Sequence, residues 1–333
     1  MRYSRMARTT VVFAAAVLAV SLAGCSDSGG KDSEDKPETG GGGKANTAEM
    51  TIAMVTHSGQ GDTFWDIVKN GAETASAKDN VKLLYTNDDK ADGQAQLVEQ
   101  AINQKVDGII VTLAKPDAMK AAVQKAVAAG IPVVSINSGS QFSKEFGALA
   151  HFGQEEGVAG EAVGEQLNKD GRKKAVCVIH EQGNVSLEER CAGVAKTFSG
   201  EVENLQVEGT DRPGVEAAVE AKLTASKDID AVVTLNADIA SASIKAKEAA
   251  GSGAEVATFD LNSDVVARME KKEVAFAVDQ QPYLQGYLAV DELWLYKQNL
   301  NIIGGGRPVL TGPAIVTAEQ APDLKKLTDN ATR

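Results

Sequence analysis

Most of this chain alternates between two hydrophobic periods. Short runs rich in Val and Ile, typical of buried parallel strands, are separated by longer segments whose apolar residues recur every three or four positions, as in helices. The first series predicts strands over 50–55, 81–85, 108–112 and 131–136, and helices over 63–77, 94–104 and 117–129. Gly130 and Pro132 mark the end of the third helix and the start of the fourth strand.

A second series begins after Phe152. It predicts strands over 175–179, 202–207, 231–235 and 256–259, and helices over 155–168, 187–198, 215–223, 239–250 and 265–271. Strands that alternate with helices form parallel sheets with crossover connections. We therefore expect an α/β fold made of two doubly wound units. Such sheets bind ligands at the carboxyl ends of their strands, so two units facing each other would form a cleft lined by strand-end loops.

The N-terminal segment departs from this pattern. Arg2, Arg5 and Arg8 precede an apolar run over 11–20, which is too short to span a membrane and has the length of a signal-peptide core. The following Leu-Ala-Gly-Cys, which ends at Cys25, resembles a bacterial lipobox. We expect a lipoprotein signal peptide over 1–24 and lipidation of Cys25. The alternative is an ordinary cleaved signal peptide with an incidental cysteine.

Composition changes again after Cys25. Residues 26–49 are mainly small, polar and charged and include four consecutive glycines, so they cannot bury enough apolar area to fold, and a disordered tether is expected over 25–49. The formal net charge is −12, and because the first 24 residues hold three arginines and no acid, the rest carries about −15. Such a charge argues against nucleic acid or an anionic membrane surface as partners.

Several strand-end segments carry a family resemblance. They read THSGQGDTFW at 56–65, GIPVV at 130–134, TFD at 258–260 and DQQPY at 279–283. In order and spacing these segments resemble the periplasmic sugar-binding proteins of the ribose-binding class, which are the solute receptors of ABC importers. The resemblance extends from Met50 to about Val316.

This resemblance implies a type I periplasmic binding protein. Its two Rossmann-like lobes, with doubly wound parallel sheets, would be joined by a hinge of three crossings near Gly153, Gln281 and Leu310. The first lobe would then comprise 50–153 and 281–310, and the second 154–280 and 311–333. Members of the family close on one sugar and perform no chemistry.

In the first lobe, the resemblance places Phe64 and Trp65 at the family's stacking aromatics, with core packing as the alternative. Asp62 is equally suited to accept sugar hydroxyls or to cap the following helix. His57 lies in the same strand-end loop and is expected to line the cleft. Asn137 stands where ribose binders carry Asp followed by Arg, and this chain has Asn137-Ser138 instead. That exchange favours a hexose or inositol over ribose.

In the second lobe, Arg190 matches the family's ligand arginine, with a surface salt bridge to Glu188 or Glu189 as the alternative. Asn236 and Asp260 each follow an apolar strand and match positions that hydrogen-bond the sugar, although polar residues there often only cap a helix. Gln280 matches a contact on the hinge side of the site.

Enzymatic signatures are lacking in the sequence. His57, His151 and His180 lie in separate regions without zinc-ligand spacing, and no nucleophile elbow, phosphate loop or dinucleotide fingerprint follows a strand. We therefore expect no catalytic residue, metal or cofactor.

Two cysteines remain after Cys25. Cys177 lies on a predicted strand and Cys191 on the next predicted helix. Exported proteins meet oxidising conditions, so we expect a disulfide, and two buried thiols are the alternative.

Together these features predict a monomeric binding protein, lipid-anchored at the outer face of the cell membrane. It would bind a small neutral sugar or polyol (a hexose, a pentose or inositol) and deliver it to the transmembrane subunits of an ABC permease. A receptor of the same fold that feeds a membrane sensor kinase is the leading alternative, and an exported lipoprotein enzyme is a second.

Overall fold

The structure is a computed structural model that describes residues 43–59 and 61–333. The expected signal peptide over 1–24 and the lipidation site Cys25 lie outside these residues. In the last part of the expected tether, the Ala45 N–H donates to the Lys78 carbonyl (2.8 Å) and the Asn80 amide donates to the Thr47 carbonyl (2.6 Å). These residues therefore lie against the folded part of the chain. No helix in the described ranges is both long and apolar enough to cross a membrane.

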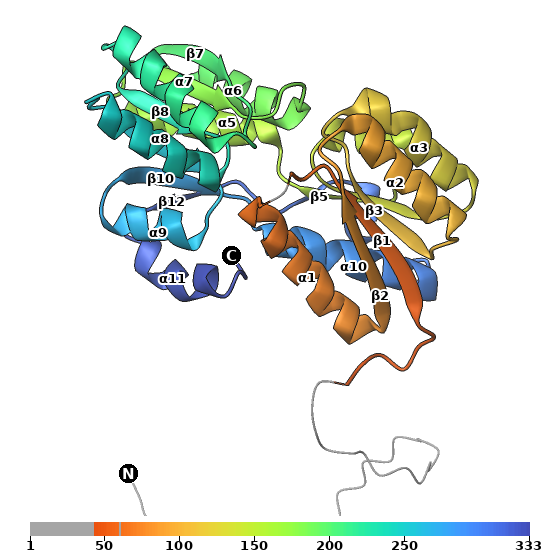
Figure 1. The fold of residues 1–333 in the computed structure, drawn as a ribbon. Coiled ribbons are helices and arrows are strands. Elements are labelled where there is room, and N and C mark those ends of the chain that lie inside the picture. Colours follow the sequence, from red (N-terminus) through yellow and green to blue (C-terminus); the bar gives the residue numbers. More distant parts are fainter. Residues whose placement is uncertain (1–42, 60) are drawn as a thin grey trace, which may run out of the picture. The chain divides into compact units, whose positions relative to one another are not determined.

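The first lobe, drawn largely in orange and yellow in Figure 1, is built on a parallel sheet with the strand order β11-β5-β4-β3-β1-β2. Its strands are β1 (Met50–Thr56), β2 (Val81–Asn87), β3 (Gly108–Thr112), β4 (Val133–Asn137), β5 (His151–Gly153) and β11 (Val309–Leu310). Its helices are α1 (Thr63–Asp79), α2 (Ala91–Asn103), α3 (Pro116–Ala128), α4 (Ser140–Phe146) and α10 (Pro282–Asn299), with a short 3-10 turn at Ile303–Gly306.

The second lobe repeats this plan with the order β12-β10-β9-β8-β6-β7. Its strands are β6 (Lys174–Ile179), β7 (Glu201–Gln206), β8 (Ala231–Thr234), β9 (Glu255–Phe259), β10 (Val274–Asp279) and β12 (Ala314–Thr317), and only β12 pairs antiparallel. Its helices are α5 (Glu156–Lys169), α6 (Val185–Thr197), α7 (Arg212–Ala225), α8 (Ala237–Ala249), α9 (Ser263–Glu270) and α11 (Ala321–Asp329). The predicted fold class of two doubly wound lobes is confirmed.

Each sheet is covered by helices on both faces. In the first lobe, α1 and α10 pack on one face, and α2 and α3 on the other. In the second, α5 and α6 cover one face while α7, α8 and α9 cover the other. Because water reaches neither face, central strands such as β3 and β4 are buried at every position, which explains their unbroken apolar runs.

The chain passes between the lobes at three places. It leaves the first sheet after β5 and enters α5, returns from β10 into α10, and leaves again between β11 and β12. The carboxyl ends of strands from both sheets therefore face the region between the lobes, and that region holds the site described next.

Candidate functional site

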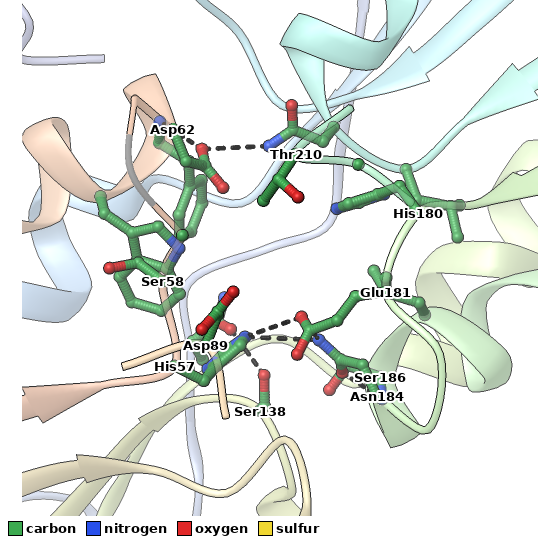
Figure 2. Close-up of a pocket in the computed structure, with 18 of the residues that line it drawn as sticks. His57, Ser58, Asp62, Asp89, Ser138, His180, Glu181, Asn184, Ser186 and Thr210 are labelled. Carbon is green, nitrogen blue, oxygen red and sulfur yellow. Dashed lines mark hydrogen bonds and ion pairs between the residues drawn. The ribbon is translucent and has the colours of Figure 1, made fainter. Parts of the chain in front are cut away.

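A cavity of about 330 Å³ lies between the strand ends of the two lobes. The structure brings all nine residues expected from the sequence to its wall: His57, Asp62, Phe64, Trp65, Asn137, Arg190, Asn236, Asp260 and Gln280. Figure 2 shows that side chains of the two lobes face one another across this space. A cavity of this size suits a small organic solute.

Phe64 and Trp65 form an aromatic wall in the first turn of α1. Their ring centroids are 5.0 Å apart with an interplanar angle of 83°, and the edge of His57 meets Trp65 at the same centroid distance. Both rings also pack into the core of the first lobe and are 5% and 6% exposed. Core packing is therefore present, and both rings also line the cavity, so stacking on a ligand stays a prediction.

His57 is held in one orientation by Thr112. The Thr112 hydroxyl accepts the His57 backbone N–H (3.1 Å) and the Gln94 amide (2.8 Å), and it lies 2.8 Å from His57 Nδ1. The other ring nitrogen, Nε2, lies 3.3 Å from the Asn184 amide nitrogen and 3.7 Å from the Glu181 carboxylate. Burial lowers the pKa of His57, which keeps this ring neutral.

The Asp62 carboxylate accepts hydrogen bonds from both lobes. One of its carboxylate oxygens accepts the Phe64 N–H (3.0 Å), which caps α1, and the Asn236 amide of the second lobe (3.1 Å). Burial and the nearby Asp238 carboxylate raise the pKa of Asp62 to about 6. The other oxygen accepts no hydrogen bond from the residues that the structure describes.

Asn137 and Asp260 share an unusual backbone. Their φ angles are +61° and +69°, in the left-handed region that residues with a side chain rarely adopt. Gln281, in the crossing beside them, has a φ of +53°. Such backbone strain persists where the surrounding structure enforces it, and it is concentrated at functional sites. Here it turns two polar side chains into the cavity, one from the last residue of β4 and one from the residue directly after β9.

Gln280 lies in the cavity wall and connects the two lobes. Its amide donates to Asp260 (2.6 Å), and its side-chain oxygen accepts from Asn137 (3.2 Å) and Gln285 (3.0 Å). Residues of both lobes therefore meet at one buried side chain in the second crossing. Burial raises the pKa of Asp260 to about 7, although Arg190 acts in the opposite direction.

Arg190 is buried rather than exposed, and its partner is not one of those expected from the sequence. Its guanidinium pairs with Glu156, and the alternative of a surface salt bridge to Glu188 or Glu189 is wrong. A third bond runs from Arg190 to the Leu235 carbonyl (3.0 Å), and the guanidinium lies 4.6 Å from the centre of the Phe259 ring. Burial opposes the charge, but the Glu156 carboxylate raises the pKa of Arg190 on balance.

Two sets of contacts join the lobes at the rims of the cleft. On one rim, Asp238 accepts from the backbone N–H and hydroxyl of Thr63 (3.4 and 3.3 Å), and Arg212 also reaches Asp238. On the other, Lys115 pairs with Glu181 at 2.9 Å. The contacts of Thr63 with Asp238 and of Lys115 with Glu181 were not expected from the sequence, because their partners lie on opposite lobes. They show that the cleft is closed in this structure.

The outer part of the cavity also holds residues that sequence reasoning missed. His180 follows β6 and Thr210 precedes α7, and both are labelled in Figure 2. Burial lowers the pKa of His180 to about 4, so this ring is neutral. The two cations at the cavity mouth, Lys115 and Arg212, are paired with carboxylates. The cavity therefore has no unpaired cation for an anionic ligand among its described lining residues.

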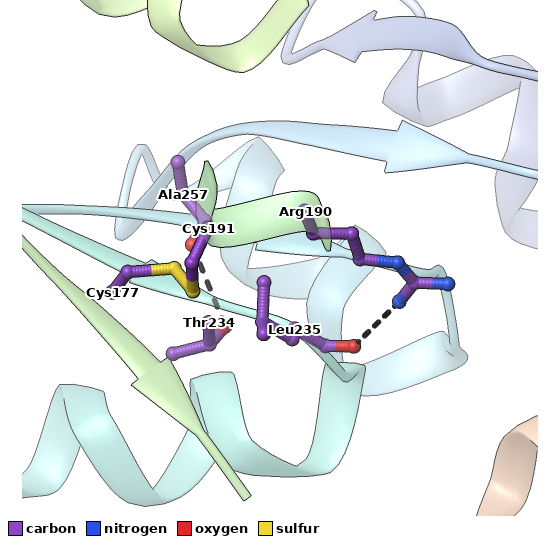
Figure 3. The surroundings of a disulfide bond; sticks show 6 residues. All are labelled: Cys177, Arg190, Cys191, Thr234, Leu235 and Ala257. Atoms are coloured by element: carbon purple, nitrogen blue, oxygen red, sulfur yellow. Dashed lines mark hydrogen bonds between the residues drawn. A yellow bond between two sulfur atoms is a disulfide. The ribbon is translucent and has the colours of Figure 1, made fainter. Parts of the chain in front are cut away.

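A disulfide joins Cys177 on β6 to Cys191 on α6, with the two Cα atoms 5.9 Å apart (Figure 3). Both cysteines are buried, and Cys191 directly follows Arg190. The bond therefore fastens α6 to the sheet beside the residue that presents a guanidinium to the cavity. In the described part of the chain, no cluster of three or more His, Cys, Asp or Glu side chains is arranged to hold a metal ion.

The two lobes, three crossings and enclosed polar cavity define the class of two-lobed solute-binding proteins. Comparisons with known proteins agree. Residues 52–300 match the family model of the periplasmic binding protein domain. The ribose import binding protein of Bacillus subtilis is 25% identical over 260 residues, covering 77% of this chain and 83% of that protein.

Solved structures give a closer match. A carbohydrate transporter from Acidothermus cellulolyticus, solved in complex with myo-inositol, is 49% identical, with a TM-score of 0.85, and the match covers 86% of this chain and all of that one. A solute-binding protein from Burkholderia graminis in complex with D-arabinose shares the fold at 24% identity and a TM-score of 0.73, over 81% of this chain and 96% of that one. The chain belongs to the periplasmic binding proteins, in the class that binds sugars for ABC transporters.

Proposed function

We propose that this protein binds a neutral cyclic polyol, with myo-inositol as the first candidate, and delivers it to the transmembrane subunits of an ABC permease. One observation carries the proposal: the described residues of the cavity wall offer both hydrogen-bond acceptors and donors, and the cations among them are paired with carboxylates. Asp62 and Asp260 offer carboxylate oxygens, while Arg190 offers N–H groups. Adjacent hydroxyls of a polyol can donate to the first two and accept from the third.

The aromatic wall supports the same ligand class. A cyclic polyol has apolar C–H surface on its ring faces, and this surface can lie against Phe64 and Trp65 while the hydroxyls bond at the ring edge. Asn137-Ser138 supplies neutral side chains at the position where ribose binders carry a charged pair. The 49% identical relative solved with myo-inositol supports this ligand over ribose.

Anchoring completes the proposal. Lipidation at Cys25 would hold the binding protein, as a monomer, at the outer face of the membrane, and the segment up to about residue 44 would give it reach toward the permease. The rim contacts that close the cleft would protect the bound solute from water until the permease opens the lobes.

A thermal-shift screen tests the ligand assignment. The purified chain is heated with myo-inositol, D-glucose, D-galactose, D-arabinose and D-ribose, each at several concentrations. A ligand present at 100 times its Kd adds about 2.7 kcal/mol to the free energy of unfolding, so a true ligand raises the Tm clearly. Myo-inositol is expected to give the largest shift and ribose a small one. If no sugar or polyol raises the Tm or gives heat in calorimetry, the proposed function is wrong.

A further inference from the structure

Glu156 makes the strongest polar contacts of Arg190, yet it does not line the cavity. Its two carboxylate oxygens accept from Nε (2.6 Å) and Nη2 (3.0 Å) of Arg190, and both side chains are almost fully buried, at 4% and 3% exposure. Two parallel bonds of this kind fix the plane of a guanidinium as well as its position.

The position of Glu156 is itself fixed from several sides. It is the first residue of α5, directly after the first crossing, and its carboxylate also accepts from the Gln154 amide at 2.8 Å. A carboxylate is stabilised at a helix N-terminus by the helix dipole. Helices α5 and α6 touch through glycine: a Cβ on Gly160 would lie 2.1 Å from the Arg190 carbonyl oxygen. The separation between Glu156 and Arg190 is therefore set by backbone packing.

These bonds determine what Arg190 can offer a ligand. A guanidinium carries five N–H donors. Among the described residues, Glu156 uses two of them and the Leu235 carbonyl one, which leaves one N–H on each terminal nitrogen. Two donors on adjacent nitrogens match two adjacent hydroxyls of a ring. The positive charge that would otherwise favour an anion is balanced by Glu156.

We propose that Glu156 is a positioning residue of the site, which aims the two remaining N–H donors of Arg190 into the cavity and cancels its charge so that the site accepts a neutral polyol. This inference rests on the proposed function. Glu156 also affects the ionisation of Asp260. The charges of Arg190, Asp62 and Glu156 all act on the Asp260 carboxyl, which accepts a hydrogen bond from Gln280. Arg190 lowers the pKa of Asp260 and Glu156 raises it. Removing the charge of Glu156 should therefore lower the pKa of Asp260.

The test replaces Glu156 by Gln, which keeps the size of the side chain and removes its charge. Binding of myo-inositol is measured by calorimetry from pH 5.5 to pH 8.5. The exposed neighbour Glu155 supplies the matched control, because Glu155→Gln removes a charge at the same helix end without touching Arg190. Glu156→Asp, which keeps the charge on a shorter side chain, is the conservative variant.

In Glu156→Gln, the affinity at pH 8 should fall about tenfold or more, because a buried charge-assisted pair is lost. The pH at which wild-type binding is half lost should also move lower in this variant. In Glu156→Asp, binding should weaken while that pH stays near the wild-type value, and Glu155→Gln should match wild type in both. A purely structural role of Glu156 would lower the Tm without moving the pH profile.

Each remaining outcome has a fixed meaning. Wild-type affinity and an unmoved pH profile in a folded Glu156→Gln variant would overturn the positioning role. If that variant does not fold, Glu156→Asp decides, and wild-type affinity there would overturn it. A wild-type protein that binds no sugar or polyol contradicts the proposed function itself, whereas a binding wild type with unaffected variants contradicts only the role of Glu156.

Discussion

Asn236 donates a hydrogen bond from its amide to the carboxylate of Asp62 across the cleft, with nitrogen and oxygen 3.1 Å apart. Each partner also caps its own helix, because Asn236 accepts the Asp238 N–H (2.8 Å) and Asp62 accepts the Phe64 N–H. The starts of α8 and α1 are therefore joined when the lobes close. Ligand recognition and closure use the same residues, so a change at one should be visible in the other.

The first prediction concerns Asp260. Replacing it by Ala removes a charged acceptor from the closed cavity and leaves ligand hydroxyls unpaired, so binding of the ligand found in the screen should weaken by about 1.5 to 3 kcal/mol. Calorimetry measures the change. Asp264→Ala removes a half-exposed carboxylate from α9 outside the cavity and should leave the affinity unchanged. Equal affinities for the two variants would place the site elsewhere.

The second prediction is a pH dependence of binding. Burial raises the pKa of Asp260 to about 7 and, together with Asp238, that of Asp62 to about 6. Ligand hydroxyls that donate to these groups favour the ionised forms, so binding releases protons. Affinity should fall as the pH drops below about 7, by up to about tenfold per pH unit for one proton. Calorimetry between pH 5 and pH 8 checks the direction, and a flat profile would contradict the assignment of Asp260 as an acceptor.

Stability without ligand should show the opposite trend. Between about pH 4 and pH 7, folded Asp260 holds a proton that the unfolded chain, with an ordinary pKa of 3.8, has lost. The folded state then binds more protons, so this group lowers the free energy of unfolding as the pH rises through this window. Urea unfolding of wild type and Asp260→Asn isolates this contribution, because the variant lacks the titrating group.

Most of the fold could be predicted from the sequence, because central strands are buried on both faces. The strand expected over 108–112 is β3 (Gly108–Thr112), and the one expected over 50–55 is β1 with one more residue. Strands at the sheet edges β11 and β12, and their neighbours β5 and β10, were missed. β5 has three residues and β11 two, which is too short for a hydrophobic period to register. Helix α10 was missed too, although it begins at Pro282, directly after the second crossing.

The site was predictable to a different extent. Asn137, Asn236 and Asp260 could be placed because strand ends converge in this fold. Glu156 could not, since its contact with Arg190 arises from the packing of α5 on α6. The partners considered for Arg190, Glu188 and Glu189, are two and one positions away on the same helix, and residues at those spacings do not face each other. Local spacing therefore indicated the wrong ion pair.

The third prediction concerns the disulfide between Cys177 and Cys191. Non-reduced peptide mapping of the exported protein should find the two cysteines linked, and two free thiols would contradict the bond. A loop of about 15 residues closed by a disulfide contributes about 3 kcal/mol to stability. Cys177→Ser combined with Cys191→Ser should therefore lower the Tm in the absence of ligand.

The fourth prediction concerns the anchor. If Cys25 carries the acyl chains, Cys25→Ser should leave the protein unprocessed or release it into the medium, because the acyl chains supply the membrane affinity. Fractionation of cells that express the full chain, with immunoblotting of membrane and medium, gives the result. Ser26→Ala, at the next position, serves as the control for processing. Unchanged processing and retention in Cys25→Ser would rule out a lipoprotein.

The last prediction follows from the rim contact between Asp238 and Thr63, which exists only while the lobes are closed. A ligand that touches both lobes should favour closure, so small-angle scattering of the wild type should show a smaller radius of gyration with ligand than without. In Asp238→Ala, closure loses a contact outside the inner polar site, so affinity should fall severalfold, mainly through faster release of the ligand. Glu248→Ala, on the exposed side of the same helix, should behave as wild type.

The ligand should be recovered chemically unchanged after long incubation, and turnover would show that the protein is an enzyme. If scattering shows no compaction with a tight ligand, the two lobes do not close around a shared site.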